Sequence, residues 1–154
     1  MAKHKSAQKL QWFALVFLKR YLLKMLVSKS TNHTDAFLTQ LTQNLTVTQL
    51  EKLIDSVLHD LKAEPATKLK ALRGLMTRRV KRLRLAHFHT KDHGQITDFL
   101  VGSCTNVESL DLRGVWLGDQ DKVMFVKAIS SMGNLTKLIL NYVADDAIME
   151  AIGR

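Results

Sequence analysis

The sequence predicts an α/β protein, in which a short solenoid of about three strand–helix units with a parallel sheet follows an α-helical N-terminal module. Three stretches share the pattern φ-x-x-Leu-x-Leu, where φ is Val or Leu, and they begin at Val80, Val107 and Leu135, 27 and then 28 residues apart. A fixed period in this range is typical of solenoids. Before the first stretch, apolar residues recur at helical spacing. We therefore expect a helical module over residues 1–64, and a capping helix plus repeats over residues 65–154.

Within each stretch the two leucines alternate with other residues, which is the period of a β-strand. We expect strands near residues 81–86, 108–113 and 136–141. After each strand, apolar side chains return at helical spacing, so each unit reads as strand, loop and helix. Parallel stacking of such units places Arg84 beside Asp111, and Arg82 near Ser109.

These units resemble the leucine-rich repeat family, in its longer intracellular type, over roughly residues 80–154. The segment from Ile96 to Leu112, with Cys104 just before the strand, is similar to the repeats of leucine-rich-repeat substrate receptors of cullin-RING ubiquitin ligases. The family usually has Asn or Cys three residues after the strand leucines, where this chain has Phe88, Val115 and Val143. The resemblance implies a curved solenoid that binds a protein on its concave face.

On that face we expect the side chains between the strand leucines. The predicted partner-binding residues are Arg82, Arg84, Asp111, Arg113, Lys137, Ile139, Asn141 and Tyr142. Arg and Tyr are common at the energetic centres of protein interfaces. An ion pair of Arg84 with Asp111 is the simpler interpretation of those two charges, and at a surface it contributes little. The last unit lacks a polar capping repeat, so we also expect its end to self-associate or to continue in a longer repeat protein.

The N-terminal module begins with a long apolar helix. Residues 9–27 carry apolar side chains around most of the helix, so one side can pack on the protein's own core and another on a partner. A second helix is expected to begin near Thr34 or Asp35, and a third at a capping box of Thr48 and Glu51. A fourth helix, about residues 67–79, is expected to cap the repeats.

The module is also loosely similar to the adaptor-binding boxes of ubiquitin-ligase substrate receptors. In an Elongin-binding box, Leu, Cys and an aliphatic residue follow one another at intervals of four, and this chain has Ala in place of Cys. The resemblance implies an Elongin- or Skp-type adaptor with a cullin as partner. The predicted adaptor-binding residues are Leu10, Ala14, Leu18, Leu50 and Leu53. The same spacing occurs in any amphipathic helix, so these residues can equally be core.

Positive charge is concentrated near the middle of the chain. The formal net charge is +9, and no acidic residue occurs between Pro65 and Lys91. The predicted basic patch consists of Lys68, Lys70, Arg73, Arg78, Arg79 and Lys81. Such a block suits phosphate backbones or acidic protein surfaces, so nucleic-acid association is an alternative function, and a solvated helix face is the simpler interpretation. Aromatic residues are not interleaved with it, which does not favour stacking of single strands.

Catalytic motifs are absent from the sequence. It has no Gly-rich phosphate loop, nucleophile elbow or paired acids at catalytic spacing, so we expect neither an enzyme nor a cofactor. His87, His89 and His93 have a spacing that can bind metal, but a polar loop is the simpler interpretation and we expect no metal site. The single cysteine, Cys104, excludes an internal disulfide. It favours an intracellular protein, cytoplasmic or nuclear, and we expect no membrane partner.

The sequence therefore predicts a non-enzymatic protein–protein interaction module. Its narrower form is a substrate receptor or adaptor of a ubiquitin ligase. The alternatives are a basic nucleic-acid-associated factor, and a truncated leucine-rich-repeat scaffold or decoy.

Overall fold

The computed structural model describes residues 2–28, 31–86, 88, 94–115, 119–140 and 146–153. The chain forms two compact units, Met1–Leu75 (unit 1) and Met76–Arg154 (unit 2), each with its own core. The sequence-based division after residue 64 differs from this one, because helix α4 (Pro65–Leu75) packs with the helices that precede it.

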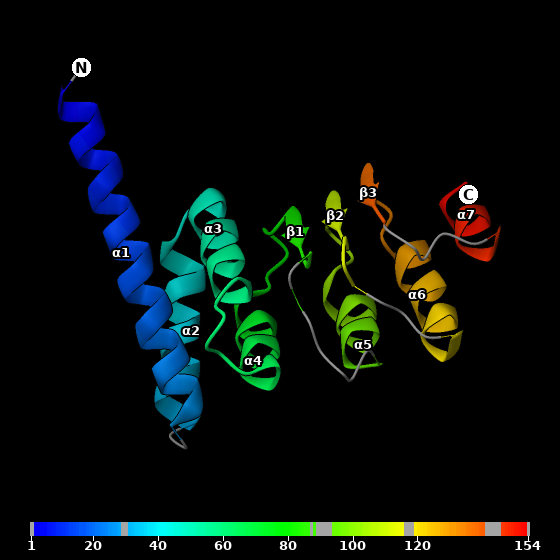
Figure 1. Cartoon of the computed structure of the whole chain (residues 1–154), viewed down its shortest axis with the longest axis horizontal. Helices are drawn as coiled ribbons and strands as arrows, with labels where there is room; N and C mark the ends of the chain where they lie inside the picture. Colours follow the sequence, from blue (N-terminus) through cyan, green and yellow to red (C-terminus); the bar gives the residue numbers. More distant parts are fainter. Residues whose placement is uncertain are drawn as a thin grey trace. The chain divides into compact units, whose positions relative to one another are not determined.

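Unit 1 is made of four helices (Figure 1). They are α1 (Ala2–Val27), α2 (Thr31–Asn44), α3 (Val47–Leu58) and α4 (Pro65–Leu75). Helix α3 has the most regular apolar stripe, and its inner residues are buried against α1 and α4. The fully buried leucines of this core come from three of the helices and include Leu22, Leu50, Leu53, Leu58, Leu72 and Leu75.

Helix α3 begins two residues earlier than expected. Its N-cap is Thr46, whose Oγ1 accepts a hydrogen bond from the Gln49 backbone N–H at 3.3 Å. The Thr46 backbone N–H in turn donates to Gln49 Oε1 at 3.0 Å. This reciprocal pair satisfies two amides that the helix leaves unpaired, so the predicted capping box of Thr48 and Glu51 is wrong.

Helix α2 approaches α4 closely at a glycine. A Cβ atom added to Gly74 would lie 2.5 Å from Leu38 Cδ1, which is shorter than any ordinary contact. Leu38 is buried there, so the missing side chain of Gly74 is what allows its packing. Glycine at this position lowers the helix propensity of α4 but allows α2 and α4 to pack closely.

The described part of unit 2 contains a small parallel sheet and three helices (Figure 1). The strands are β1 (Arg82–Arg84), β2 (Ser109–Asp111) and β3 (Lys137–Ile139), in the order β1-β2-β3. The helices are α5 (Gly94–Ser103), α6 (Asp119–Ser131) and α7 (Asp146–Ile152). The register places Arg82 beside Ser109, and Arg84 beside Asp111, which confirms the pairing expected from the repeat period.

The predicted fold class, a leucine-rich-repeat solenoid, is nevertheless wrong. The described part of the chain is mostly helical, with seven helices, and its sheet consists of three strands of three residues each. The expected strands are about twice too long, and after the first two leucine pairs the chain turns at once. The Phe88 N–H donates to the Leu85 carbonyl at 2.9 Å, and the Val115 N–H to the Leu112 carbonyl at 3.0 Å.

The core of unit 2 is deepest at the first two strands. Leu83 and Leu110 are almost completely buried, and so is Phe125 of α6. The corresponding residue of β3, Leu138, is only half-buried, and so are Leu135 and Leu140 beside it. β3 has a strand neighbour on one side, β2, among the described residues, so its leucines receive less cover than those of the central strand.

Candidate functional site

Helix α1 carries an exposed apolar stripe, which consists of Leu10, Phe13, Phe17 and Tyr21. These side chains are 72%, 61%, 68% and 46% exposed. Their spacing of three and four residues places them on one face of the helix. Large apolar side chains that are exposed singly are ordinary, but a contiguous row of four is typical of an interaction surface.

The stripe exists because α1 is apolar on nearly all sides. Leu22 and Leu26, on another face, are buried in the core of unit 1. Helices α2, α3 and α4 all contact α1, but they cover only part of its circumference. In Figure 1 the N-terminal part of α1 extends past the ends of these three helices. Leu10 and Phe13, in the N-terminal half of α1, are accordingly left largely exposed.

Aromatic contacts fix one end of the stripe. The Phe17 and Tyr21 rings are stacked with centroids 6.2 Å apart, and Tyr21 meets Phe37 of α2 edge-on at 5.0 Å. Such pairs contribute beyond their buried area, about 0.5–1.5 kcal/mol each. Toward the N-terminus, Trp12 is 60% exposed and meets Phe13 edge-on at 5.2 Å. The stripe is thus anchored on α2 at Tyr21 and open at Phe13.

The stripe lies in a region of positive charge. Seven Lys and Arg residues precede Asp35, which is the first acidic residue of the chain. Lys9, Arg20 and Lys24 are exposed on α1. At about 100° per residue, Arg20 lies at one edge of the stripe, and Lys24 lies in line with the stripe, about one turn after Tyr21. Lys19 points elsewhere and pairs with Asp60 at 2.7 Å.

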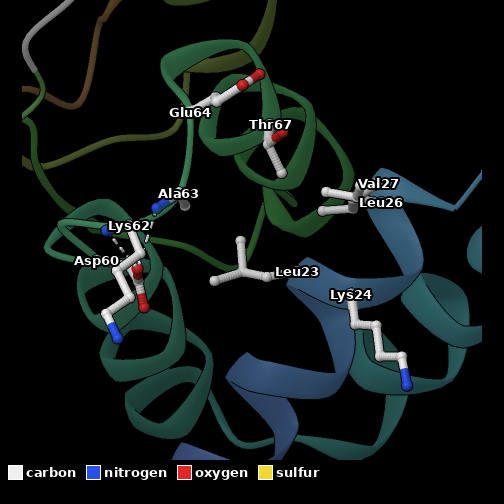
Figure 2. A pocket seen from close by; sticks show the side chains of 9 residues that line it. All are labelled: Leu23, Lys24, Leu26, Val27, Asp60, Lys62, Ala63, Glu64 and Thr67. Carbon is white, nitrogen blue, oxygen red and sulfur yellow. Dashed lines mark hydrogen bonds between the residues drawn. The ribbon is translucent and has the colours of Figure 1, made fainter.

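A cavity of about 680 Å³ opens at the other end of α1 (Figure 2). Leu23 points into it, and Leu26 and Val27 lie at one wall, opposite the α3–α4 loop. Lys24, although it lines the cavity, points away from the other labelled side chains in Figure 2. The apolar wall and the absence of a convergent polar set suit an apolar side chain better than a reaction.

The carboxylate at this cavity is already fully engaged. Asp60 Oδ1 accepts the backbone N–H groups of Lys62 and Ala63 at 3.0 and 3.1 Å, and Oδ2 pairs with Lys19. The hydrogen bond from Lys19 holds the pKa of Asp60 below its usual value, against the opposing effect of burial. Asp60 therefore fixes the loop to α1 and is not a candidate acid or base.

The residues predicted to bind a partner on the sheet are partly brought together. In one row of the sheet Arg82 lies beside Ser109 and then Lys137, and in the next Arg84 lies beside Asp111 and then Ile139. Arg82, Arg84 and Lys137 are exposed, whereas Asp111 is buried. Asn141 and Tyr142 lie outside the described residues. Partner binding at this face remains a prediction.

Asp111 pairs with Arg113 rather than with its strand neighbour. Arg113 donates from Nε to Oδ1 at 3.0 Å and from Nη2 to Oδ2 at 2.7 Å, a two-point contact. These bonds lower the pKa of Asp111, and the charge of Arg84 adds to the effect. The simple Arg84–Asp111 pair is therefore replaced by a local fork that orients the turn after β2.

The predicted basic patch is divided between the two units. Lys68, Lys70 and Arg73 belong to unit 1, and Arg78, Arg79 and Lys81 to unit 2. Lys68 is buried, and its Nζ donates to the Leu58 carbonyl at 2.9 Å, where positive charge stabilises the C-terminal end of α3. Lys81 pairs with Glu108 at 3.0 Å. These two lysines have structural partners, which weakens the interpretation of the block as a phosphate-binding patch.

The predicted adaptor-binding residues separate into two groups. Leu10 and Ala14 are exposed and Leu18 is half-buried, so this part of α1 is accessible. Leu50 and Leu53 are completely buried in unit 1. As core residues of α3 they cannot contact an adaptor unless the unit opens, so their assignment as a contact surface needs correction. The exposed residues that the site prediction lacked are Trp12, Phe13, Phe17 and Tyr21.

The remaining chemical groups offer no reactive arrangement. Cys104 is buried, and burial raises the pKa of its thiol to about 12, so it stays protonated. No group of three or more possible metal ligands occurs in the described part of the chain. His87, His89 and His93 lie outside it. Among the helices so described, none is both long enough and apolar enough to cross a membrane.

Comparisons with known proteins add no relative. No protein family, no curated protein and no solved structure matches the chain.

Proposed function

We propose that the protein is a non-enzymatic protein-binding module, and that α1 is its recognition helix. The single observation that carries the proposal is the row of Leu10, Phe13, Phe17 and Tyr21, exposed on a helix whose other side is core. Apolar anchors at intervals of three, four and seven residues are the pattern by which one helix is recognised in the groove of another protein. The aromatic content matches the composition of interface centres.

Most of the stripe contributes little to the core, which is a second support. Leu22 and Leu26 secure α1 to unit 1, so Leu10, Phe13 and Phe17 gain much less from the protein itself. Exposed Phe and Trp promote aggregation when they have no partner. A binding role gives the row of large apolar side chains a physical purpose.

A matched pair of variants tests the proposal. Phe13→Asp with Phe17→Asp introduces charge into the stripe, while Gln43→Asp with Val123→Asp places the same charge at exposed positions of α2 and α6. We expect tagged wild type and the control variant to recover a common partner from cell extract, and the stripe variant to lose it. Circular dichroism should be the same for all three. Equal recovery by the stripe variant would refute the proposal.

The narrower prediction of an Elongin- or Skp-type adaptor is tested in the same experiment. Leu10→Asp with Ala14→Asp alters two exposed positions, so the fold should remain. If the recovered partner is such an adaptor with its cullin, this variant should lose it. If the recovered partner is neither such an adaptor nor a cullin, the ligase interpretation is rejected, while the proposal that α1 is a recognition helix stands.

A nuclease-treated sample tests the nucleic-acid alternative. A partner that is recovered through nucleic acid should be lost after nuclease treatment, and its binding should weaken steeply as the salt concentration rises. Charge reversal at Lys70 and Arg73, which are exposed on α4, should then remove it. Recovery that survives nuclease leaves the protein partner as the explanation.

A further inference from the structure

We propose that the partner of α1 is an acidic protein, and that its groove encloses the N-terminal half of the helix on more than one side. This inference rests on the proposed function and goes further, because it states the charge and the shape of the partner surface. It is drawn from three observations on α1: its charge, the position of Trp12, and the contrast between its two ends.

The first observation is the charge of the helix. Lys9, Arg20 and Lys24 are exposed on α1, and the helix has no acidic residue at all. A groove that covers the stripe brings its rim close to Arg20 and Lys24. A basic rim would make like-charge contacts there, whereas acidic rim residues would pair with these side chains and accelerate association. The stripe therefore fits an acidic surface.

The same charge argues against a second copy of the chain. Two copies of α1 that met along their stripes, parallel or antiparallel, would offer Arg20 and Lys24 no carboxylate, because the helix has no acidic residue. Asp60, which pairs with Lys19 of α1, is already bound to this lysine and to two backbone amides. A symmetric contact between stripes would therefore leave the positive charges of both helices without an opposite charge on either helix.

The second observation is the position of Trp12. It lies two residues from Leu10, which in an α-helix is a rotation of about 200°. Both side chains are nonetheless exposed, at 60% and 72%. A flat surface such as a lipid bilayer can cover one side of a helix but not two nearly opposite sides. A groove with walls can cover both, so this arrangement favours a folded protein over a membrane.

The third observation is the contrast between the two ends of α1. Tyr21 is already held by Phe37, and the residues that follow are packed in unit 1. The N-terminal part extends past the other helices, so a partner can surround it without unfolding the unit (Figure 1). The groove therefore encloses the exposed segment from Lys9 to Ala14 and continues along the stripe to Tyr21, beside Arg20.

Photo-crosslinking of the full chain tests the shape. A photoreactive phenylalanine analogue replaces Trp12 in one protein, Phe17 in a second, and the exposed Gln43 of α2 in a control. Each is irradiated in cell extract at about 0.1 M salt, where charges act over about 10 Å, and at about 1 M, where they act over about 3 Å. We expect the same acidic protein to be captured from positions 12 and 17 but not from 43. Capture should fall about tenfold at high salt, as the loss of a few rim ion pairs implies.

The purified captured protein then tests the charge. Arg20→Glu with Lys24→Glu should weaken its binding about tenfold or more, whereas Lys52→Glu with Lys70→Glu, the same change on α3 and α4, should leave it unaltered. A basic partner, salt-insensitive capture, or equal binding by both variants would overturn the acidic partner. Capture from position 17 alone would overturn the enclosing groove.

Other outcomes separate the inference from the function on which it rests. One such outcome is a crosslink that joins two copies of this chain. Another is flotation of the wild type with phosphatidylserine vesicles that is lost in the Phe13→Asp, Phe17→Asp variant. Either result would overturn the inference and keep the stripe as a binding surface. If positions 12 and 17 capture no more than position 43 at either salt concentration, the recognition helix itself fails.

Discussion

Substitution of two residues of α1 tests directly which side of the helix belongs to the core of unit 1. Leu22 is completely buried, and Phe17 is 68% exposed. If α1 is a core helix on one side and a recognition helix on the other, truncation of these residues must have very different effects on stability. We therefore compare Leu22→Ala with Phe17→Ala in the full chain.

The expected costs follow from the covered areas. A Phe side chain has about 200 Å² of surface, so about 65 Å² of Phe17 is covered in the folded protein. At about 25 cal/mol per Å² this is worth about 1.6 kcal/mol, which is an upper bound because an unfolded chain also covers some surface. We expect Phe17→Ala to cost about 1 kcal/mol. Leu22→Ala removes fully buried methyl groups and leaves a cavity, so it should cost about 3–5 kcal/mol.

Urea unfolding, followed by far-UV circular dichroism, measures the difference. With a slope of about 2 kcal/mol per M, the midpoint of the transition that reports unit 1 should fall by about 0.5 M for Phe17→Ala and by about 1.5 M or more for Leu22→Ala. Val123→Ala, at a 74% exposed position of α6, serves as the control for an exposed truncation. Equal shifts for Phe17 and Leu22 would mean that the stripe is packed in the folded protein, and would refute the argument for a recognition helix.

Three further predictions concern groups with defined partners. Asp60→Asn removes the carboxylate that pairs with Lys19 at 2.7 Å, so it should cost about 1–3 kcal/mol at pH 7. Because the folded pKa of Asp60 is lowered, the pair stabilises the protein above the unfolded pKa of about 3.9 and is lost as the pH falls through the folded pKa. The stability gap between wild type and variant in urea should therefore close below about pH 4, and a gap of constant size would contradict the ion pair. Cys104, with its buried thiol and a pKa of about 12, should react with a thiol reagent at pH 8 only when urea unfolds the chain, and rapid labelling of the native protein would contradict its burial. Gly74→Ala gains about 1 kcal/mol of helix propensity, but its Cβ would lie 2.5 Å from Leu38 Cδ1, so a net loss of about 1 kcal/mol is expected in urea unfolding. In a Leu38→Ala background the same change should become stabilising, and a stabilising effect with Leu38 present would show that the helices are not in close contact there.

Spacing along the sequence determined the pairing of the sheet. Val80, Val107 and Leu135 begin equivalent stretches, so equivalent residues of neighbouring strands had to lie side by side. The observed partners of Arg82 and Arg84 are the expected ones. Register follows from a repeat because a shift by one residue would turn every leucine from the core to the surface.

The same repeat misled the prediction of the fold class. Alternating leucines such as Leu83 and Leu85 indicate which side chains are buried, but not how many residues stay extended. The Phe88 N–H closes a turn on Leu85 at once, so the strands stop at three residues and helices dominate the described chain. The length of each of these strands is set by a turn hydrogen bond between residues three apart, and the leucine pattern does not predict that bond.

The accessible face of α1 could not be predicted because nearly every face of the helix is apolar. Leu10 and Leu22 look equivalent in the sequence, yet one is 72% exposed and the other completely buried. The difference comes from which parts of α1 are covered by α2, α3 and α4, which is a property of the packed unit. Leu50 and Leu53 failed as contact residues for the complementary reason, since a regular apolar stripe on a short helix is most readily satisfied by the protein's own core.

The positive charge of the chain shows why residue type alone does not locate a site. Lys19, Lys68 and Lys81 have partners within the described structure, in a carboxylate, a helix carbonyl and a glutamate respectively. Each of them stabilises the fold and has less to offer to a ligand. Arg20 and Lys24 differ because they lie beside exposed aromatic side chains on a helix without acidic residues. A surface that combines positive charge with exposed apolar side chains fits a partner that is both acidic and apolar. The proposed function is therefore assigned to α1 because of this combination, and not because of the net charge of +9.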